Sequence, residues 1–400
     1  MGAWAGKDLG EKNCTKYEVA PACCLIFIKL ITVYLSMLFL KIHSSSLSFF
    51  AVGHNCITLF MTCVSLSRLS TLSLTKKYRA VVKKFITEIH LCHSRNDSDY
   101  AMETHVNVHK KSYFITIYLN CLVFIGLLLF NSSPLYNNYK NGKLSFTNKN
   151  NISFEFAVYY ALPFNTVTNL KGYIVVAIFN WCSVYICANV FCMFDLLVYF
   201  MVFHVCGHFK ILLHNLKSFP KPALISNNGM KNNVFNDAQL YSHQEMIEID
   251  NKLKQCINYH RILIKFTDGI SNAFGPMLFV FYVFHQVSGC VLLLEIYQMN
   301  PAALIKYGPL TLALFQQLLQ LSFIIELIGT VTGQLKDAVY GVPWEHMDTT
   351  NRKTVMIFLM NVQEPMLVDA MGLAKVGVTS RAAIIKTSLS YLAFLRPAAE

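Results

Sequence analysis

Long uninterrupted apolar runs are the feature of this sequence that most restricts its fold. A helix needs roughly 20 mostly apolar residues to cross the hydrocarbon core of a membrane, because each residue advances about 1.5 Å. Only 14% of the residues are charged, against about a quarter in a soluble domain. The runs that reach or nearly reach spanning length are 21–40, 47–67, 113–130, 173–205, 272–297 and 303–330. The sequence therefore predicts an all-α polytopic membrane protein.

A seventh, more polar run lies near the C-terminus, at residues 379–396. It carries Arg381, Lys386 and several hydroxyl side chains. Polar groups at membrane depth are costly unless they face protein or water. We therefore expect a seventh transmembrane helix that lines a cavity or a pore. The alternative is an amphipathic helix on the membrane surface.

The Lys and Arg residues between the runs predict the orientation, because basic connections tend to remain in the cytoplasm. Four alternating segments hold 24 of them, whereas the other connections hold 5. The four basic segments are 1–20, 68–112, 207–267 and 331–378. We expect a cytoplasmic N-terminus and, with seven spans, an extracellular C-terminus. The glycosylation sequons at Asn131 and Asn151 fall in a connection that this count places outside.

Two predicted cytoplasmic segments also have apolar residues at helical spacing. One begins near Asn236 and continues into the fifth span, and the other is 349–366. We expect residues 1–330 to form a six-helix transmembrane ligand-binding region with inner helical extensions. Residues 331–400 would then hold a cytoplasmic anchor helix and the pore-lining seventh helix.

Polar residues within or beside the apolar runs have competing interpretations. His204, Cys206 and His208 could suggest a metal site, but residues two apart on a helix point to different sides, so we expect none. Lys29 lies inside the first run, and we expect its side chain to extend toward the inner membrane surface. No cluster has the pattern of a catalytic centre, so we expect neither an enzyme nor a cofactor.

The C-terminal part of the chain resembles the insect odorant receptors. The residues that carry the resemblance are a Tyr before a Pro-Trp pair, a Gln-x-Pro, a Gly and a Ser-x-Ser-Tyr run, here Tyr340, Pro343, Trp344, Gln363, Pro365, Gly372, Ser388, Ser390 and Tyr391. Looser similarity upstream includes Asp195 and His204. The last run lacks the signature of related gustatory receptors. The second inner connection is also as short as in odorant-tuning subunits.

The resemblance implies an odorant-gated, non-selective cation channel that is a heterotetramer with the family's coreceptor. It implies a small volatile odorant as ligand and the plasma membrane of olfactory sensory neuron dendrites as the location. Membrane lipid would surround the chain, and we expect no nucleic acid despite the net charge of +12. The alternatives are a gustatory-type receptor or a G-protein-coupled chemoreceptor, the latter disfavoured by the predicted cytoplasmic N-terminus.

The outer halves of spans two, three, four and six should enclose the odorant, because pockets in helix bundles form between helices. The candidate ligand-binding residues are Phe49, Phe50, His54, Leu122, Ile125, Phe179, Cys182, Tyr185, Tyr307, Leu310 and Phe315. Each of them alone is more typical of packing than of a pocket. The candidate pore and gate residues are Thr387, Ser390, Tyr391 and Phe394, of which Phe394 would help to dewet the closed pore.

Overall fold

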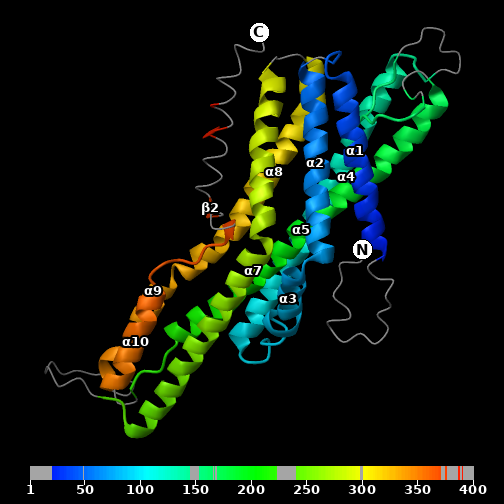
Figure 1. The fold of residues 1–400 in the computed structure, drawn as a ribbon. Helices are drawn as coiled ribbons and strands as arrows, with labels where there is room; N and C mark the ends of the chain where they lie inside the picture. Colours follow the sequence, from blue (N-terminus) through cyan, green and yellow to red (C-terminus); the bar gives the residue numbers. More distant parts are fainter. Residues whose placement is uncertain are drawn as a thin grey trace.

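The computed structural model of this chain is a bundle of long helices (Figure 1). It describes residues 20–47, 49–144, 153–164, 166, 169–222, 240–297, 301–370, 374–375, 386–387 and 390. The predicted seventh span, 379–396, therefore lies almost entirely outside the described residues. Within the described part, six helices are long and apolar enough to cross a membrane.

The six helices coincide with the six predicted apolar runs, which confirms the all-α membrane fold. They are α1 (Ala20–His43), α2 (Phe49–Leu74), α4 (Asp99–Lys140), α5 (Leu170–Lys217), α7 (His243–Tyr297) and α8 (Pro301–Thr332). Two of them begin at capping residues, because the Ser98 hydroxyl accepts the Ala101 N–H and the Asn169 amide oxygen accepts the Lys171 N–H.

Three of these helices are far longer than the membrane requires. At about 1.5 Å per residue, α4, α5 and α7 reach roughly 60, 70 and 80 Å, against a hydrocarbon core of about 30 Å. The helix α7 begins at His243, so the predicted continuation of the fifth span into the inner segment is confirmed. The predicted inner helix is also confirmed as α10 (Thr349–Asn361), capped by the Asp348 carboxylate.

Short elements complete the end of the bundle that the basic residues predict to be cytoplasmic, and the sequence patterns did not predict these elements. They are α3 (Lys76–Lys84), the π-helical turn η3 (Phe85–Ile89), α9 (Leu335–Tyr340), the 3-10 turn η4 (Trp344–His346), and the antiparallel two-residue strands β1 (Asp369–Ala370) and β2 (Ala374–Lys375). In Figure 1, α9 and α10 lie beside the lower parts of α5 and α7.

The main core surrounds the second half of α5. Side chains from α3, α4, α7, α8, α9 and α10 pack against this part of α5, where Phe194, Tyr199 and Phe209 are fully buried. The turn after η3 approaches α5 so closely that a Cβ added at Gly207 would lie 2.6 Å from Leu91 Cδ1. By contrast, α4 exposes large apolar side chains such as Phe114 and Phe124, as expected for a lipid-facing helix.

Candidate functional site

A short stretch of the connection between α4 and α5 folds back over the helices at the predicted outer end. In this stretch, residues 153–162, alternate side chains are buried: Phe154, Phe156, Val158 and Tyr160. The Asn138 side chain donates to Glu155 O (2.8 Å) and accepts from the Glu155 N–H (2.9 Å). The Ala161 N–H donates to Leu35 O of α1 (3.1 Å). We call residues 153–162 the outer cover.

Two buried side chains attach the outer cover to the bundle. His54 of α2, a predicted ligand-binding residue, hydrogen-bonds through Nε2 to Ala157 O (3.1 Å) and stacks on Phe130 at 6.4 Å between ring centroids. Asn180 of α5, which sequence reasoning missed, donates through Nδ2 to Val158 O (3.1 Å). Both residues are buried. An apolar region with a few fixed polar groups is typical of a small-molecule site.

Lys29 is not where the sequence suggested. Its side chain is 1% exposed, and Nζ donates to Ser183 O at 3.0 Å and to Ser183 Oγ at 3.4 Å. The expectation that Lys29 extends toward the inner membrane surface is therefore wrong. A lysine in an apolar environment needs acceptors, and α5 supplies them 154 positions further along the chain. The sequence gives no sign of this pairing.

The other candidate ligand-binding residues occupy varied environments. Phe179 contacts Tyr160 of the outer cover edge-to-face at 5.5 Å, and Leu122 is half-buried on α4. Leu310 and Phe315 of α8 pack against buried clusters. Ile125 is 52% exposed, and Cys182 and Tyr185 are also exposed, so these three face away from the interior of this chain. The side chains of Phe49, Phe50 and Tyr307 lie outside the described ones.

The predicted gate is described only in part. Thr387 and Ser390 are exposed, and the Ser390 hydroxyl donates to Lys386 O (2.9 Å). Tyr391 and Phe394 lie outside the described residues. The role of these four residues stays a prediction.

The structure describes one of the two predicted glycosylation sites, Asn131, but not the other. Asn131 lies within α4, is 5% exposed, and donates through Nδ2 to Leu127 O (3.0 Å). A buried, hydrogen-bonded amide cannot carry a bulky glycan, so the geometry argues against the prediction at Asn131. Asn151 lies outside the described residues.

We expect any glycan on this connection to depend on Asn151. The Asn151→Gln variant should abolish the mobility shift that an N-glycosidase produces on gels, whereas Asn131→Gln should leave it unchanged. The two substitutions remove the same chemical group, so each is the control for the other. A shift lost only with Asn131→Gln would contradict the helical, buried placement of that residue.

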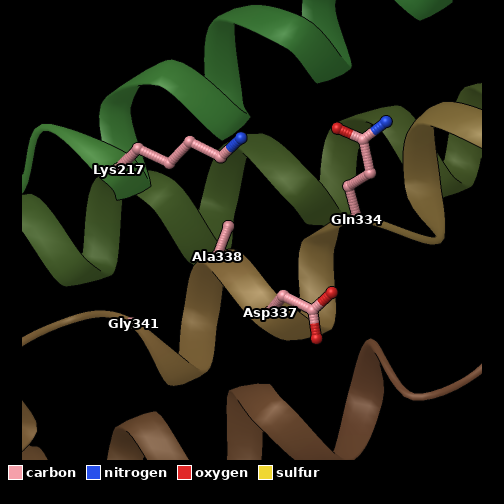
Figure 2. Close-up of a pocket in the computed structure, with 5 residues that line it drawn as sticks. All are labelled: Lys217, Gln334, Asp337, Ala338 and Gly341. Carbon is pink, nitrogen blue, oxygen red and sulfur yellow. The ribbon is translucent and has the colours of Figure 1, made fainter.

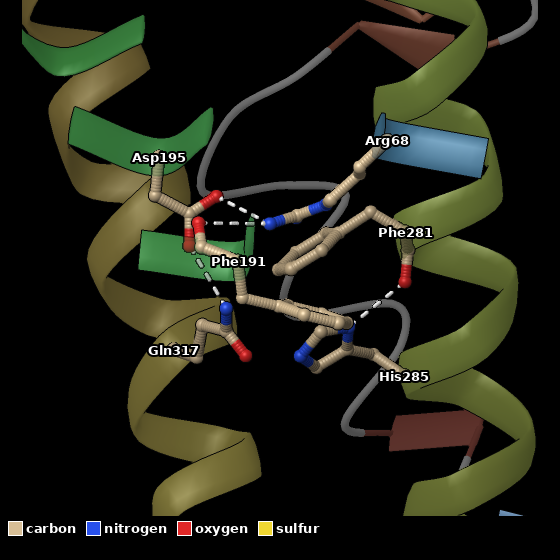
Figure 3. A network of polar contacts seen from close by, with 6 residues as sticks. All are labelled: Arg68, Phe191, Asp195, Phe281, His285 and Gln317. Carbon is tan, nitrogen blue, oxygen red and sulfur yellow. Dashed lines mark hydrogen bonds and ion pairs between the residues drawn. The ribbon is translucent and has the colours of Figure 1, made fainter. Parts of the chain in front are cut away.

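A buried ionic network joins four helices near the middle of the bundle (Figure 3). Arg68 of α2 donates through Nη1 to Asp195 Oδ1 of α5 (3.0 Å) and to Phe191 O (3.2 Å). Gln317 of α8 donates to the other carboxylate oxygen, Asp195 Oδ2 (2.8 Å). His285 of α7 lies beside them and donates to Phe281 O (2.8 Å).

Aromatic rings enclose the cation of this network. The Arg68 guanidinium carbon lies 4.3, 4.6 and 5.1 Å from the ring centroids of Phe191, Phe194 and Phe281, within the range of cation–π attraction. Arg68 does not belong to the predicted inner basic segment 68–112, because it lies inside α2 and is 0% exposed. Removing it from the basic count leaves the predicted orientation unchanged.

Histidines gather at the inner end, where His204 and His208 hold the turn that follows η3. The Leu91 N–H donates to His204 Nδ1 (3.1 Å), and His208 Nε2 donates to Ile89 O (2.5 Å). The His90 ring lies 4.1 Å from that of His204. Burial lowers the pKa of His90, and the neighbouring histidines lower it further. No group of three or more His, Cys, Asp and Glu among the described residues has metal-binding geometry. The described contacts of His204 and His208 are hydrogen bonds and ring contacts with the chain itself.

A cavity of about 290 Å³ lies at the predicted inner end of the bundle (Figure 2). It is lined by Lys217, Gln334, Asp337, Ala338 and Gly341, between the end of α5 and the helix α9. Three of its five lining residues are charged or polar, and the cavity is partly open to solvent. These properties do not suit a volatile apolar ligand, so we do not assign the odorant to this cavity.

Sequence comparisons identify relatives of this chain. The sequence profile described as "7tm Odorant receptor" matches residues 50–389. Odorant receptor 13a of Drosophila melanogaster is 24% identical over 361 residues, which covers 86% of this chain and 79% of that receptor. Odorant receptor 42a of the same organism is 22% identical over 157 residues, 39% of each chain.

Solved structures extend the similarity to the fold. The olfactory receptor OR5 of Machilis hrabei superimposes with a TM-score of 0.75 at 14% identity, covering 96% of this chain and 90% of that one. The structure of the same receptor in complex with eugenol also superimposes with a TM-score of 0.75, and it covers 97% of this chain and 92% of that one. The family is one of receptors, in agreement with the prediction that the chain is not an enzyme. Because the profile match extends over most of the chain, this protein belongs to the 7tm odorant receptor family.

Proposed function

We propose that this chain is the odorant-tuning subunit of an odorant-gated, non-selective cation channel. The ligand is a small volatile molecule that binds beside the outer cover among α1, α2, α4 and α5, so α1 takes the place of the sixth span, α8, in the sequence-based prediction. The observation that carries this proposal is the outer cover itself, an ordered lid whose buried apolar side chains lie beside His54 and Asn180. The eugenol complex of the Machilis receptor supports ligand binding within this fold.

We also propose that the pore is shared with a coreceptor, because one pore-lining helix cannot enclose a channel alone. The inner helix α10 supports assembly, since Met356, Ile357 and Met360 are 62%, 60% and 65% exposed outside the spanning segments. Exposed apolar patches of this kind mark contact surfaces between proteins. Residues 1–330 then serve ligand binding, and residues 331–400 serve anchoring and the pore, with Phe394 at the gate. The channel works in the plasma membrane of olfactory neuron dendrites.

Current recording tests this function. Cells that express this chain with a coreceptor should give odorant-evoked cation currents, whereas this chain alone should give none. His54→Ala should raise the half-maximal odorant concentration about tenfold, because it releases the outer cover at Ala157. His243→Ala, at an exposed position at the start of α7, is the matched control. A silent response to a broad odorant panel, despite surface expression of both chains, would reject the proposed function.

A further inference from the structure

Lys29 lacks a counter-charge in the described structure. Its Nζ carries three N–H donors, and its partners are the carbonyl and hydroxyl oxygens of Ser183. None of the ion pairs among the described residues includes Lys29. This differs from Arg68, whose charge is matched by Asp195 at 3.0 Å.

The depth of Lys29 makes the missing partner significant. It lies about 14 Å along α1 from Ala20, and Ser183 lies about 20 Å along α5 from Leu170, so both are within the spanning parts of their helices. Ionisable side chains at this depth are costly and normally have a partner or a role in a ligand or ion pathway. The bundle supplies the partner for Arg68 from its own chain. The described residues supply no such partner for Lys29.

A second polar atom, on the helix that binds Lys29, also lacks a partner among the described residues. Asn180 precedes Ser183 by three residues, so the two side chains share one face of α5. Asn180 Nδ2 is bound to Val158 O, but its Oδ1 is buried and has no partner among the described residues. Tyr160 of the outer cover lies over this face, against Phe179 and beside the Ser183 hydroxyl. The region thus offers cationic donors, one free acceptor and aromatic walls.

We propose that Lys29, Ser183 and Asn180 form the head-group site for a small volatile carboxylic acid. A carboxyl group meets one of the two needs of the site in each protonation state. The carboxylate supplies the negative charge that the Lys29 ammonium lacks, and this form distinguishes an acid from an alcohol. The neutral acid accepts from Lys29 through its carbonyl and donates its O–H to Asn180 Oδ1. An ester, ketone or aldehyde has no O–H and no charge, and an alcohol has no charge. The apolar tail lies against Tyr160 and Phe179. This inference rests on the proposed function and names its ligand class.

Matched ligands test the head group in cells that express this chain with a coreceptor. Hexanoic acid, methyl hexanoate, hexanal and 1-hexanol share one apolar tail and differ in the head group. The acid should evoke currents at a concentration about tenfold or more below the other three, since a hydrogen bond to a charged group contributes more than a neutral one. Equal or better responses to the ester or the aldehyde would overturn the proposal without any variant.

Variants then test the residues. Lys29→Met should raise the half-maximal concentration of hexanoic acid about tenfold or more and change that of 1-hexanol by less than about threefold. Lys41→Met, an exposed lysine on the same helix, should change neither. Because Lys29→Met removes a buried contact, Ser183→Ala provides a second variant that keeps the carbonyl acceptor and removes only the hydroxyl. An acid response that is unaltered in both variants would overturn the assignment.

Ligand binding to the purified chain separates this proposal from the channel function. Hexanoate should raise the melting temperature of the detergent-solubilised chain more than methyl hexanoate does, and Lys29→Met should remove the difference. If currents are absent but this Lys29-dependent shift is present, the head-group site stands and the channel proposal fails. If hexanoate stabilises the wild type no more than the ester does, the head-group site is rejected whatever the currents show.

Discussion

Replacing Arg68 with Met is expected to lower the free energy of unfolding of this receptor by roughly 3–5 kcal/mol, because it leaves the buried Asp195 carboxylate without its cation. The charge of Asp195 would then be held only by the Gln317 amide. The three phenylalanine rings around Arg68 would lose the cation that they surround. Thermal unfolding in detergent and the amount of receptor at the cell surface measure the loss.

Two controls give this prediction its specificity. Lys254→Met also removes the cation of an ion pair, but Lys254 is 68% exposed beside Asp250, so the loss should be below about 1 kcal/mol. The double variant Arg68→Met with Asp195→Asn removes both charges and keeps an acceptor for Gln317. It should be more stable than Arg68→Met alone. A double variant as unstable as the single one would show that the charge of Asp195 is not the cause.

Truncating Phe274 to Ala should also destabilise the fold strongly, by about 3–5 kcal/mol. Phe274 of α7 is fully buried, and its ring meets Tyr78 of α3 at 5.5 Å and Phe194 of α5 at 5.4 Å. Its removal leaves a cavity where three elements join, and the packed core cannot fill it completely. Thermal unfolding in detergent measures this loss as well.

Phe124→Ala is the matched control, because it removes the same side chain from α4, where Phe124 is 62% exposed. That surface faces lipid or detergent, so its loss should cost less than about 1 kcal/mol. Similar losses for the two variants would mean that the region around Phe274 is not the tightly packed core that the structure describes.

Sequence patterns predicted the spans well because a spanning helix is defined by length and polarity alone. The patterns did not predict the positions of single basic residues that are buried between helices. An Arg immediately after an apolar run is typical of a loop, and Arg68 follows the run 47–67 directly. Only Asp195, 127 positions away, makes its burial possible. The same reason explains the error at Lys29, whose acceptor lies on another helix.

The candidate site was predictable only in outline. His54 was identified from sequence, and the structure places it against the outer cover. The cover itself was not predicted, because its alternating buried residues follow a polar loop and resemble no span. The exposed position of Ile125 could not be predicted either, since the apolar residues of the spanning part of α4 are not concentrated on one side of the helix and do not fix which side faces the bundle.

The uneven burial of α5 has a consequence for how such receptors diversify. Along the first turns of this helix, side chains such as Ile174, Val175 and Ile178 are largely exposed, whereas from Val198 to Leu213 nearly every side chain is enclosed. Substitutions of the exposed side chains near the outer end change few packed contacts, so they cost little in folding. The enclosed end tolerates far less change. One helix thus combines a region whose surface is free to vary with a region held nearly constant.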